Sequence, residues 1–334
     1  MSKSVTRADV AKAAGVAEST VSRALNDSPL ISEPIKQKVK RVAHSLGYYP
    51  SRTATLFAKN KSFCIGFVCP HYKKIKPFSR AYFPSLLDGV IEGVTERKYQ
   101  VNIVIDQCFG QYRSYDELIN SHVVDGLIFS ITDENFSPIF KLMDSNLPFV
   151  LVNNYFQGAS SVYARPDKGM HKAMEYLYNN GHTNVGYITG DLNFKNGKDR
   201  LSNFENLAHK FHMNPKIVKG NFSKSSGYNA FNNFKDNMPS VVMAACDRQA
   251  FGFMQACTNN DLIIPKDVQV VGYDNFYPAA INNPPLTTIS HPIFDMGIRA
   301  SNLLIDLIEG KDQNKQIWYD TDFVVRQSTI GKEK

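Results

Sequence analysis

The sequence predicts an α/β protein in which a small domain of three helices precedes a larger body of two lobes, each a parallel sheet flanked by helices. Three observations predict this fold. Helical periodicity fills the first fifty residues, short apolar runs alternate with amphipathic stretches over the rest of the chain, and the excess positive charge is confined to the N-terminal fifth.

The charge distribution divides the chain into two unequal parts. Residues 1–61 contain 11 Lys and Arg against 4 Asp and Glu, whereas residues 62–334 contain 27 of each kind. A basic module joined to a neutral body indicates that the first part binds a polyanion; the alternative is a solvated basic surface without a partner.

Other features of composition exclude several classes of protein. The first ten residues lack the apolar region of a secretory signal, and no run approaches the roughly 18–20 apolar residues that cross a bilayer. The five cysteines form no CxxC pair, which favours free thiols in a reducing cytoplasm over disulfides or a zinc site. We therefore expect a cytoplasmic protein with no membrane partner, no metal and no cofactor.

Capping residues and apolar spacing predict the three N-terminal helices. Thr6 can cap a helix over about Arg7–Ala14, and a glycine-containing turn follows it. A second helix spans roughly Glu18–Asn26, and a third begins after Ser32 and ends at Gly47. The apolar stripe of the third helix consists of Ile35, Val39, Val42 and Leu46.

Two helices joined by a glycine-containing turn form the geometry that places the second helix in the major groove of DNA. Arg23, on the polar face of the second helix, offers a planar fork that can bind guanine O6 and N7. Ser19 and Ser22 can reach bases or phosphates, and Thr6 lies where a backbone phosphate would be contacted. Taken alone this is weak evidence, because many helical hairpins bind nothing.

The body is predicted to hold seven strands and at least three helices in alternation, which is typical of parallel sheets covered on both faces. The strands are expected at 63–69, 101–105, 126–131, 149–152, 185–189, 241–245 and 268–273. Amphipathic helices are expected at 86–97, 170–179 and 250–259. Since this is too many strands for one small sheet, two similar lobes are expected.

The segment from Val5 to Ala54 resembles the headpiece of the LacI/GalR family of bacterial transcription regulators. The shared elements are the VT..DVA..AGV start, TVSRALN in the second helix, and LGY.P before the linker. Later matches to the family are DGLIF (125–129), NNGHTNVGYITG (179–190), DRLSNF (199–204), VVGYDN (270–275), PPLTTISHP (284–292) and VVRQST (324–329). The resemblance therefore extends over essentially the whole chain.

The resemblance implies a helix-turn-helix headpiece and a core like that of periplasmic binding proteins. The headpiece would be residues 1–49, followed by a hinge helix or linker at 50–61. The core would comprise an N-terminal subdomain of 62–162 and 292–320 and a C-terminal subdomain of 163–291 and 321–334. The implied DNA contacts are Thr6, Glu18, Ser19, Thr20, Ser22, Arg23, Asn26, Ser32, Arg52, Ala54 and Phe57.

Three positions of the headpiece and linker distinguish this chain from the usual family pattern. Ala17 stands where the family usually has a capping Ser, and loss of such a cap costs about 0.5–2 kcal/mol. Glu18 can accept a hydrogen bond from cytosine N4 but would repel phosphate. Phe57 takes the place of the usual Leu wedge of the hinge helix and can unstack a base step; packing against a dimer mate is the alternative.

The resemblance also implies an effector site between the lobes, where open α/β sheets bind ligands. Asp274 matches the family's ligand-binding Asp, and Arg200 matches the family Arg that reaches the ligand from the other lobe. Phe222 matches an aromatic platform. The other implied contacts are Tyr82, Phe83, Phe194, Asn196 and Cys246. The aromatic residues have core packing as their alternative.

Nearby charged residues are open to more than one interpretation. Asp247 is expected to cap a helix. Arg165 and Lys168 would suit an acidic or phosphorylated effector if they face the ligand; surface placement is the alternative.

These features predict a DNA-binding regulator of a carbohydrate operon, with no enzymatic activity, whose affinity for operator DNA responds to a sugar or sugar phosphate. The headpiece implies a homodimer on a near-palindromic operator, and the chain's end soon after VVRQST favours a dimer over a tetramer. A co-repressor, either a purine or a phosphocarrier protein, is the alternative to an inducing sugar. A solute-binding protein is more remote. An enzyme is disfavoured because GxSxG, P-loop, GxGxxG and HExxH motifs do not occur.

Overall fold

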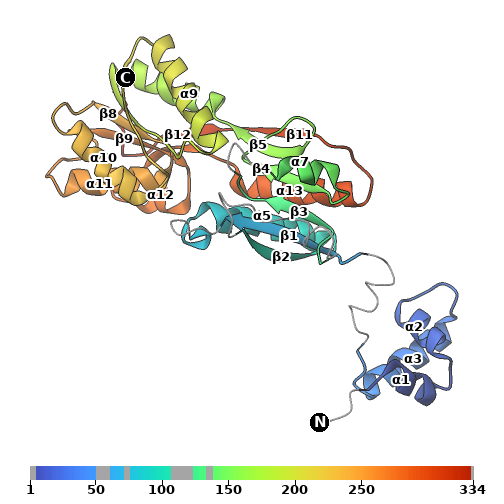
Figure 1. The fold of residues 1–334 in the computed structure, drawn as a ribbon. Coiled ribbons are helices and arrows are strands. Elements are labelled where there is room, and N and C mark those ends of the chain that lie inside the picture. The colour runs from blue at the N-terminus through green and yellow to red at the C-terminus, as the bar shows by residue number, and fades with distance from the viewer. Residues whose placement is uncertain (1–4, 50–60, 71–75, 107–122, 133–137, 332–334) are drawn as a thin grey trace. The chain divides into compact units, whose positions relative to one another are not determined.

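The computed structural model describes residues 5–49, 61–70, 76–106, 123–132 and 138–331. Two compact units divide the chain between Ser62 and Phe63 (Figure 1). The predicted linker residues Arg52, Ala54 and Phe57 lie outside the described residues.

The described part of the N-terminal unit, residues 5–49, contains three helices, α1 (Arg7–Ala14), α2 (Glu18–Leu25) and α3 (Glu33–Ser45). Thr6 caps α1 as predicted: its backbone N–H donates to Asp9 Oδ2 at 2.8 Å, and its hydroxyl accepts from the Asp9 N–H. The core of this unit is made of small and β-branched residues, namely Val10, Ala11, Ala14, Val21, Ala24, Val39 and Ala43. The predicted stripe on α3 is partly wrong, because Ile35 and Leu46 are each 38% exposed and Ala43 takes their place in the core.

The first lobe of the body is a sheet of six parallel strands in the order β11-β5-β4-β3-β1-β2. The strands are β1 (Cys64–Pro70), β2 (Gln100–Asp106), β3 (Gly126–Phe129), β4 (Phe149–Val152), β5 (Ser160–Arg165) and β11 (Gln316–Asp320). Among its described residues, the helical elements are η1 (Pro77–Ser79), α5 (Tyr82–Glu96), α7 (Ile139–Asp144) and α13 (Ile293–Ile308). Helices α5 and α13 pack so closely that a Cβ on Gly89 would lie 2.0 Å from the Phe294 carbonyl oxygen.

The second lobe is a sheet in the order β12-β10-β9-β8-β6-β7, parallel except for β12 against β10. The strands are β6 (Asn184–Ile188), β7 (Asn214–Val218), β8 (Val241–Ala244), β9 (Gln269–Asp274), β10 (Thr287–Ser290) and β12 (Asp322–Val324). The helices are α8 (Asp167–Asn179), α9 (Lys195–Lys210), α10 (Lys224–Phe234), α11 (Asp247–Thr258) and α12 (Tyr277–Ile281). The seven predicted strands are present, and the two-lobed α/β fold is confirmed.

Within the described ranges the chain passes between the lobes after β5, after β10, and between β11 and β12. The subdomain boundary expected at residue 162 falls inside β5, which belongs to the first sheet as far as Arg165. The residues that line the cleft between the lobes follow the carboxyl ends of strands in both sheets, and the predicted ligand contacts lie there.

Among the helices of the described ranges, none has the length and apolar character that crossing a bilayer requires. Cys64, Cys69, Cys246 and Cys257 are buried free thiols. The described residues contain no cluster of His, Cys, Asp or Glu arranged to hold a metal ion.

Candidate effector cleft and DNA-binding surface

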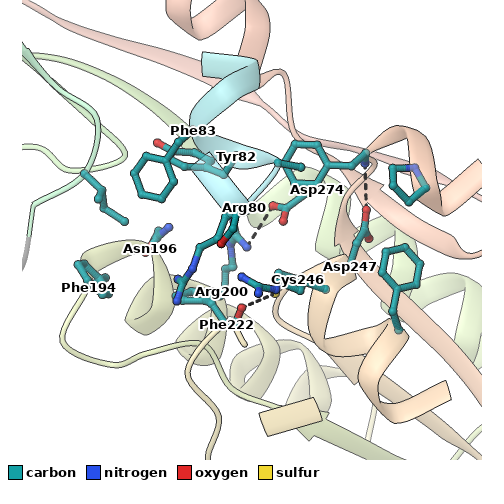
Figure 2. A pocket seen from close by; sticks show the side chains of 17 residues that line it. Arg80, Tyr82, Phe83, Phe194, Asn196, Arg200, Phe222, Cys246, Asp247 and Asp274 are labelled. Carbon is teal, nitrogen blue, oxygen red and sulfur yellow. Dashed lines mark hydrogen bonds and ion pairs between the residues drawn. The ribbon is translucent and has the colours of Figure 1, made fainter. Parts of the chain in front are cut away.

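A cavity of about 290 Å³ lies in the cleft between the two lobes (Figure 2). Its walls come from segments that follow the carboxyl ends of strands in both sheets. All eight residues predicted as effector contacts line it: Tyr82, Phe83, Phe194, Asn196, Arg200, Phe222, Cys246 and Asp274. The further lining residues are Ser79, Arg80, Ala81, Ile131, Asp247, Arg248, Phe251, Phe276 and Pro278.

Arg200, on α9, lies in the second lobe together with Asp274, so the expectation that it reaches the ligand from the other lobe is wrong. Its guanidinium lies over the ring of Tyr273, with 3.6 Å between Cζ and the ring centroid, and it donates to the carbonyl oxygen of Ala245. The same guanidinium is 3.5 Å from Asp274 Oδ1 and 3.4 Å from His291 Nδ1. Only 4% of Arg200 is exposed, so these contacts hold it rigidly for a ligand that enters from the cleft.

Asp274 ends β9 with a backbone φ of 121°, a conformation that costs a non-glycine residue about 1–3 kcal/mol. This backbone directs the carboxylate at Arg200 (Figure 2). Burial raises the pKa of Asp274, and the positive charge of Arg200 opposes that rise. The side chain is therefore an acceptor for ligand hydroxyl groups that is already oriented by an ion pair.

Asp247 does not cap its own helix, so the sequence-based expectation for it is wrong. Its Oδ1 accepts from the Thr288 hydroxyl at 2.5 Å and its Oδ2 from the Phe276 N–H at 3.0 Å, which ties the start of α11 to the segments after β9 and in β10. Burial, with the charge of Asp274 adding to it, raises the pKa of Asp247. The two aspartates together thus carry less than their full negative charge near neutral pH.

The aromatic residues form the apolar walls. Phe222 has a φ of 60° and its ring fills the space beside Gly190, where an added Cβ would lie 2.1 Å from a ring carbon. The Tyr82 hydroxyl is used within the protein, since it donates to the Ser130 carbonyl oxygen and accepts from Asn153 Nδ2, each at 2.7 Å. Tyr82 therefore offers its ring rather than its hydroxyl to a ligand.

Two of the predicted polar contacts differ in what they can offer. Asn196 is 8% exposed, and its Oδ1 has no hydrogen-bond partner among the residues that the structure describes. The Cys246 thiol points toward the Phe222 carbonyl oxygen and Gln249 Oε1, at 3.7 and 3.5 Å, and burial raises its pKa to about 12. Asn196 thus has an unsatisfied acceptor, whereas Cys246 is a neutral thiol that already has hydrogen-bond acceptors within the protein.

Sequence reasoning missed two arginines of the cavity and weighed two other basic residues in their place. Arg165 and Lys168 pair with Asp320 at 3.0 and 2.6 Å and do not line the cavity. Arg80 and Arg248 do line it. The position of Arg248, two residues beyond Cys246 and close to the carboxyl end of a predicted strand, is the sequence feature that could have identified it.

On the headpiece, the predicted DNA contacts of α2 divide by exposure. Glu18, Ser19, Arg23 and Asn26 are exposed, whereas Thr20 and Ser22 are half-buried. Thr6 and Ser32 are exposed at the N-termini of α1 and α3. Ala17 precedes α2 without a side-chain cap, as its residue type dictates.

The fold and these two sites define a class of protein: a helix-turn-helix module attached to a two-lobed ligand-binding body. Residues 6–51 match the family of bacterial regulatory proteins of the lacI type, and residues 174–329 match the periplasmic binding protein-like domain. The chain belongs to the LacI family of bacterial transcription regulators, which are DNA-binding proteins rather than enzymes.

Several LacI-type repressors are similar in sequence to this chain over nearly its full length. The "Probable HTH-type transcriptional repressor ExuR" of Bacillus subtilis (strain 168) is 28% identical over 97% of this chain and 98% of its own length. The ribose operon repressor of Haemophilus influenzae is 28% identical with the same coverage, and the transcriptional repressor PurR of Vibrio campbellii is 26% identical, again with that coverage.

Solved structures show the same fold. The lac repressor dimer bound to operator and the anti-inducer ONPF superposes with a TM-score of 0.85 at 23% identity, over 98% of this chain and 99% of that one. The complex of the transcriptional regulator CelR with cellobiose has a TM-score of 0.71 at 25% identity, over 97% of this chain and all of that one.

Proposed function

We propose that this protein represses a carbohydrate operon by binding a near-palindromic operator as a cytoplasmic homodimer, and that a sugar or sugar phosphate in the cleft weakens that binding. The observation that carries the proposal is the arrangement of Arg200, Asp274 and Phe222 in one cavity. An oriented carboxylate and guanidinium suit ligand hydroxyl groups, and an aromatic face suits a sugar ring.

The proposed mechanism uses the division of the cavity between the lobes. The first lobe, taken as residues 63–165 and 292–320, contributes Tyr82 and Phe83, and the second contributes Arg200 and Asp274. A ligand that contacts both lobes favours one closure state of the cleft over the other. Linkage requires that the operator favour the opposite state, typically by 1–3 kcal/mol of coupling.

On the DNA side, α2 of each subunit would lie in the major groove of one half-site, with Arg23 and its neighbours contacting bases. The hinge assignment for Arg52, Ala54 and Phe57 remains part of the proposal. Two headpieces related by a two-fold axis require two half-sites of opposite orientation, and hence the near-palindrome.

The test is a titration of a complex between the full-length protein and an operator selected from random DNA. Sugars, sugar phosphates and purines are added in turn, and fluorescence anisotropy measures the DNA that remains bound. We expect at least one carbohydrate to weaken the affinity for the operator about fivefold or more. Release by nucleobases alone, or tightening by every active ligand, would instead establish the co-repressor alternative.

A further inference from the structure

The cavity carries more positive charge than its central ion pair accounts for. Three arginines and two aspartates are among its described lining residues. Arg200 and Asp274 pair with each other, and both oxygens of Asp247 accept hydrogen bonds from Thr288 and Phe276. Arg248 lines the same cavity and has no ion pair or hydrogen bond with the described residues. Its charge is therefore available to a ligand.

The positions of the arginines favour a bound anion. Arg248 is the second residue of α11, a helix of 12 residues whose N-terminus adds partial positive charge to the same end of the cavity. Arg80 lines the cavity from the first lobe, and Arg248 lines it from the second. The charge of Arg248, together with the N-terminus of α11, would attract an anionic group of a ligand in the cavity.

The rest of the cavity indicates what the anion is attached to. The unpartnered Oδ1 of the buried Asn196 requires a donor, which a hydroxyl group supplies and an alkyl chain does not. The aromatic walls, which include Phe194 and Phe222, suit the apolar face of a sugar ring. A volume of about 290 Å³ is at the small end for ligand sites, which favours a monosaccharide over a longer saccharide.

We infer that the ligand of this cleft is a monosaccharide bearing a carboxylate or phosphate group, and that Arg248 binds that group while Asn196 accepts from a ligand hydroxyl. This inference rests on the proposed function and narrows its ligand class. Arg248 is half-buried at the cleft, and burying the Asn196 acceptor without a partner is unfavourable until a ligand arrives.

Isothermal titration of the full-length protein tests the charge requirement with matched pairs of ligands. D-Glucuronate, D-gluconate and glucose 6-phosphate are compared with D-glucose, and D-galacturonate is compared with D-galactose. We expect at least one anionic ligand to bind tenfold or more tightly than its neutral parent. Comparison of the sugar carboxylates with glucose 6-phosphate identifies which anionic group the site prefers. Equal affinity for neutral parents and anions, or no binding by any anion, would overturn the inference.

Substitutions then test the assignment to Arg248. Arg248→Gln is expected to reduce the ratio of anion to neutral affinity tenfold or more, and Arg248→Lys to retain most of it. Lys266→Gln is the matched control, because it removes one positive charge from an exposed position outside the cavity. A circular dichroism melt establishes that each variant is folded. If Arg248→Gln retains the ratio and Arg80→Gln loses it, the assignment to Arg248 is wrong.

The operator assay separates this inference from the proposed function. Release of DNA by neutral sugars alone would leave the carbohydrate-responsive repressor intact and would contradict the anion requirement. An operator complex insensitive to every carbohydrate would contradict both. Asn196→Asp provides a further test, because a carboxylate at that position repels an anionic ligand. The affinity for the anion is expected to fall by more in Asn196→Asp than in Asn196→Ser.

Discussion

The guanidinium of Arg7, in the first turn of α1, holds the carboxylate of Glu18, in the first turn of α2, with 3.0 Å between Arg7 Nε and Glu18 Oε2. The pair lies at the start of the helix predicted to contact bases. Because only Nε is used, the two terminal nitrogens of Arg7 remain able to donate to a guanine or a phosphate. Arg7 also offsets the negative charge of Glu18 that would otherwise repel DNA.

Glu18→Gln should therefore change base preference more than stability. The two side chains are 52% and 48% exposed, and pairs of that kind contribute about 0–1 kcal/mol to folding. Loss of the charge frees Arg7 and alters the sequence that the half-site requires. Selection from DNA with a randomised half-site measures the change. The control is Glu33→Gln, which removes an exposed carboxylate that pairs with Lys36 on α3. An identical selected sequence would contradict a role for the pair.

Arg23→Ala should cost about 1–3 kcal/mol of binding on the selected operator and relax the preference at one base pair. The reason is that Arg23 is exposed on α2 and its fork can satisfy both acceptors of a guanine. Binding to the operator and to single-base variants measures the effect, with Arg41→Ala on α3 as the comparison. Uniform weakening across all the variants would show that Arg23 contacts phosphate only.

The strands of the two lobes could be predicted from sequence where apolar residues are consecutive. Strands such as β4 and β8 are continuous apolar runs buried on both faces. Strand β7 reads Asn-Pro-Lys-Ile-Val at a sheet edge and is largely exposed, so no apolar run marks it. Strand β12 has three residues and pairs with β10 only in the assembled lobe. Tertiary context, and not local sequence, determines such edge strands.

The cavity was predictable where a residue matches a family motif and unpredictable where it depends on neighbours in space. The match identified Asp274 and Arg200, but not that Tyr273 supports the guanidinium or that Asp247 accepts from Thr288. Arg248 and Arg80 belong to no motif quoted for the family, and only the fold brings their segments to one cavity. Local sequence patterns do not record contacts between segments this distant in the chain.

Arg200→Met should destabilise the protein by about 3–5 kcal/mol, because it leaves the buried carboxylate of Asp274 without its partner. The double variant Arg200→Met, Asp274→Asn removes the unpaired charge and should be more stable than Arg200→Met alone. Urea unfolding of the wild type, of the single variants Arg200→Met and Asp274→Asn, and of the double variant gives the coupling energy between the two residues. Additive effects of the two substitutions would mean that the 3.5 Å contact contributes no coupling.

Gly190→Ala should weaken ligand binding by displacing Phe222. A Cβ at residue 190 would lie 2.1–2.7 Å from three atoms of the Phe222 ring, so the ring must move away from the cavity wall. Calorimetric affinity for the best ligand of the panel above measures the loss, which we expect to be about tenfold, or 1.4 kcal/mol. Gly331→Ala, where an added Cβ makes only ordinary contacts, is the control. Unchanged affinity would show that Phe222 is not a platform for the ligand.

Affinity for a sugar acid should fall as the pH rises from 6 to 9. Burial raises the pKa values of Asp247 and Asp274, so both lose protons over this range and the cavity gains negative charge.

The other titratable groups that face these carboxylates keep their charge state over the same range. Arg200 stays protonated, burial keeps His291 neutral by lowering its pKa well below the usual value, and the Cys246 thiol stays neutral. A sugar carboxylate is ionised throughout, because unperturbed carboxylic acids titrate near pH 4. Its affinity is therefore expected to fall by about tenfold, the equivalent of one pKa unit or 1.36 kcal/mol. Titration calorimetry at four pH values measures this, with the neutral parent sugar as the control for effects on the fold. An anion affinity that is constant or rises with pH would mean that these two carboxylates do not titrate against the ligand.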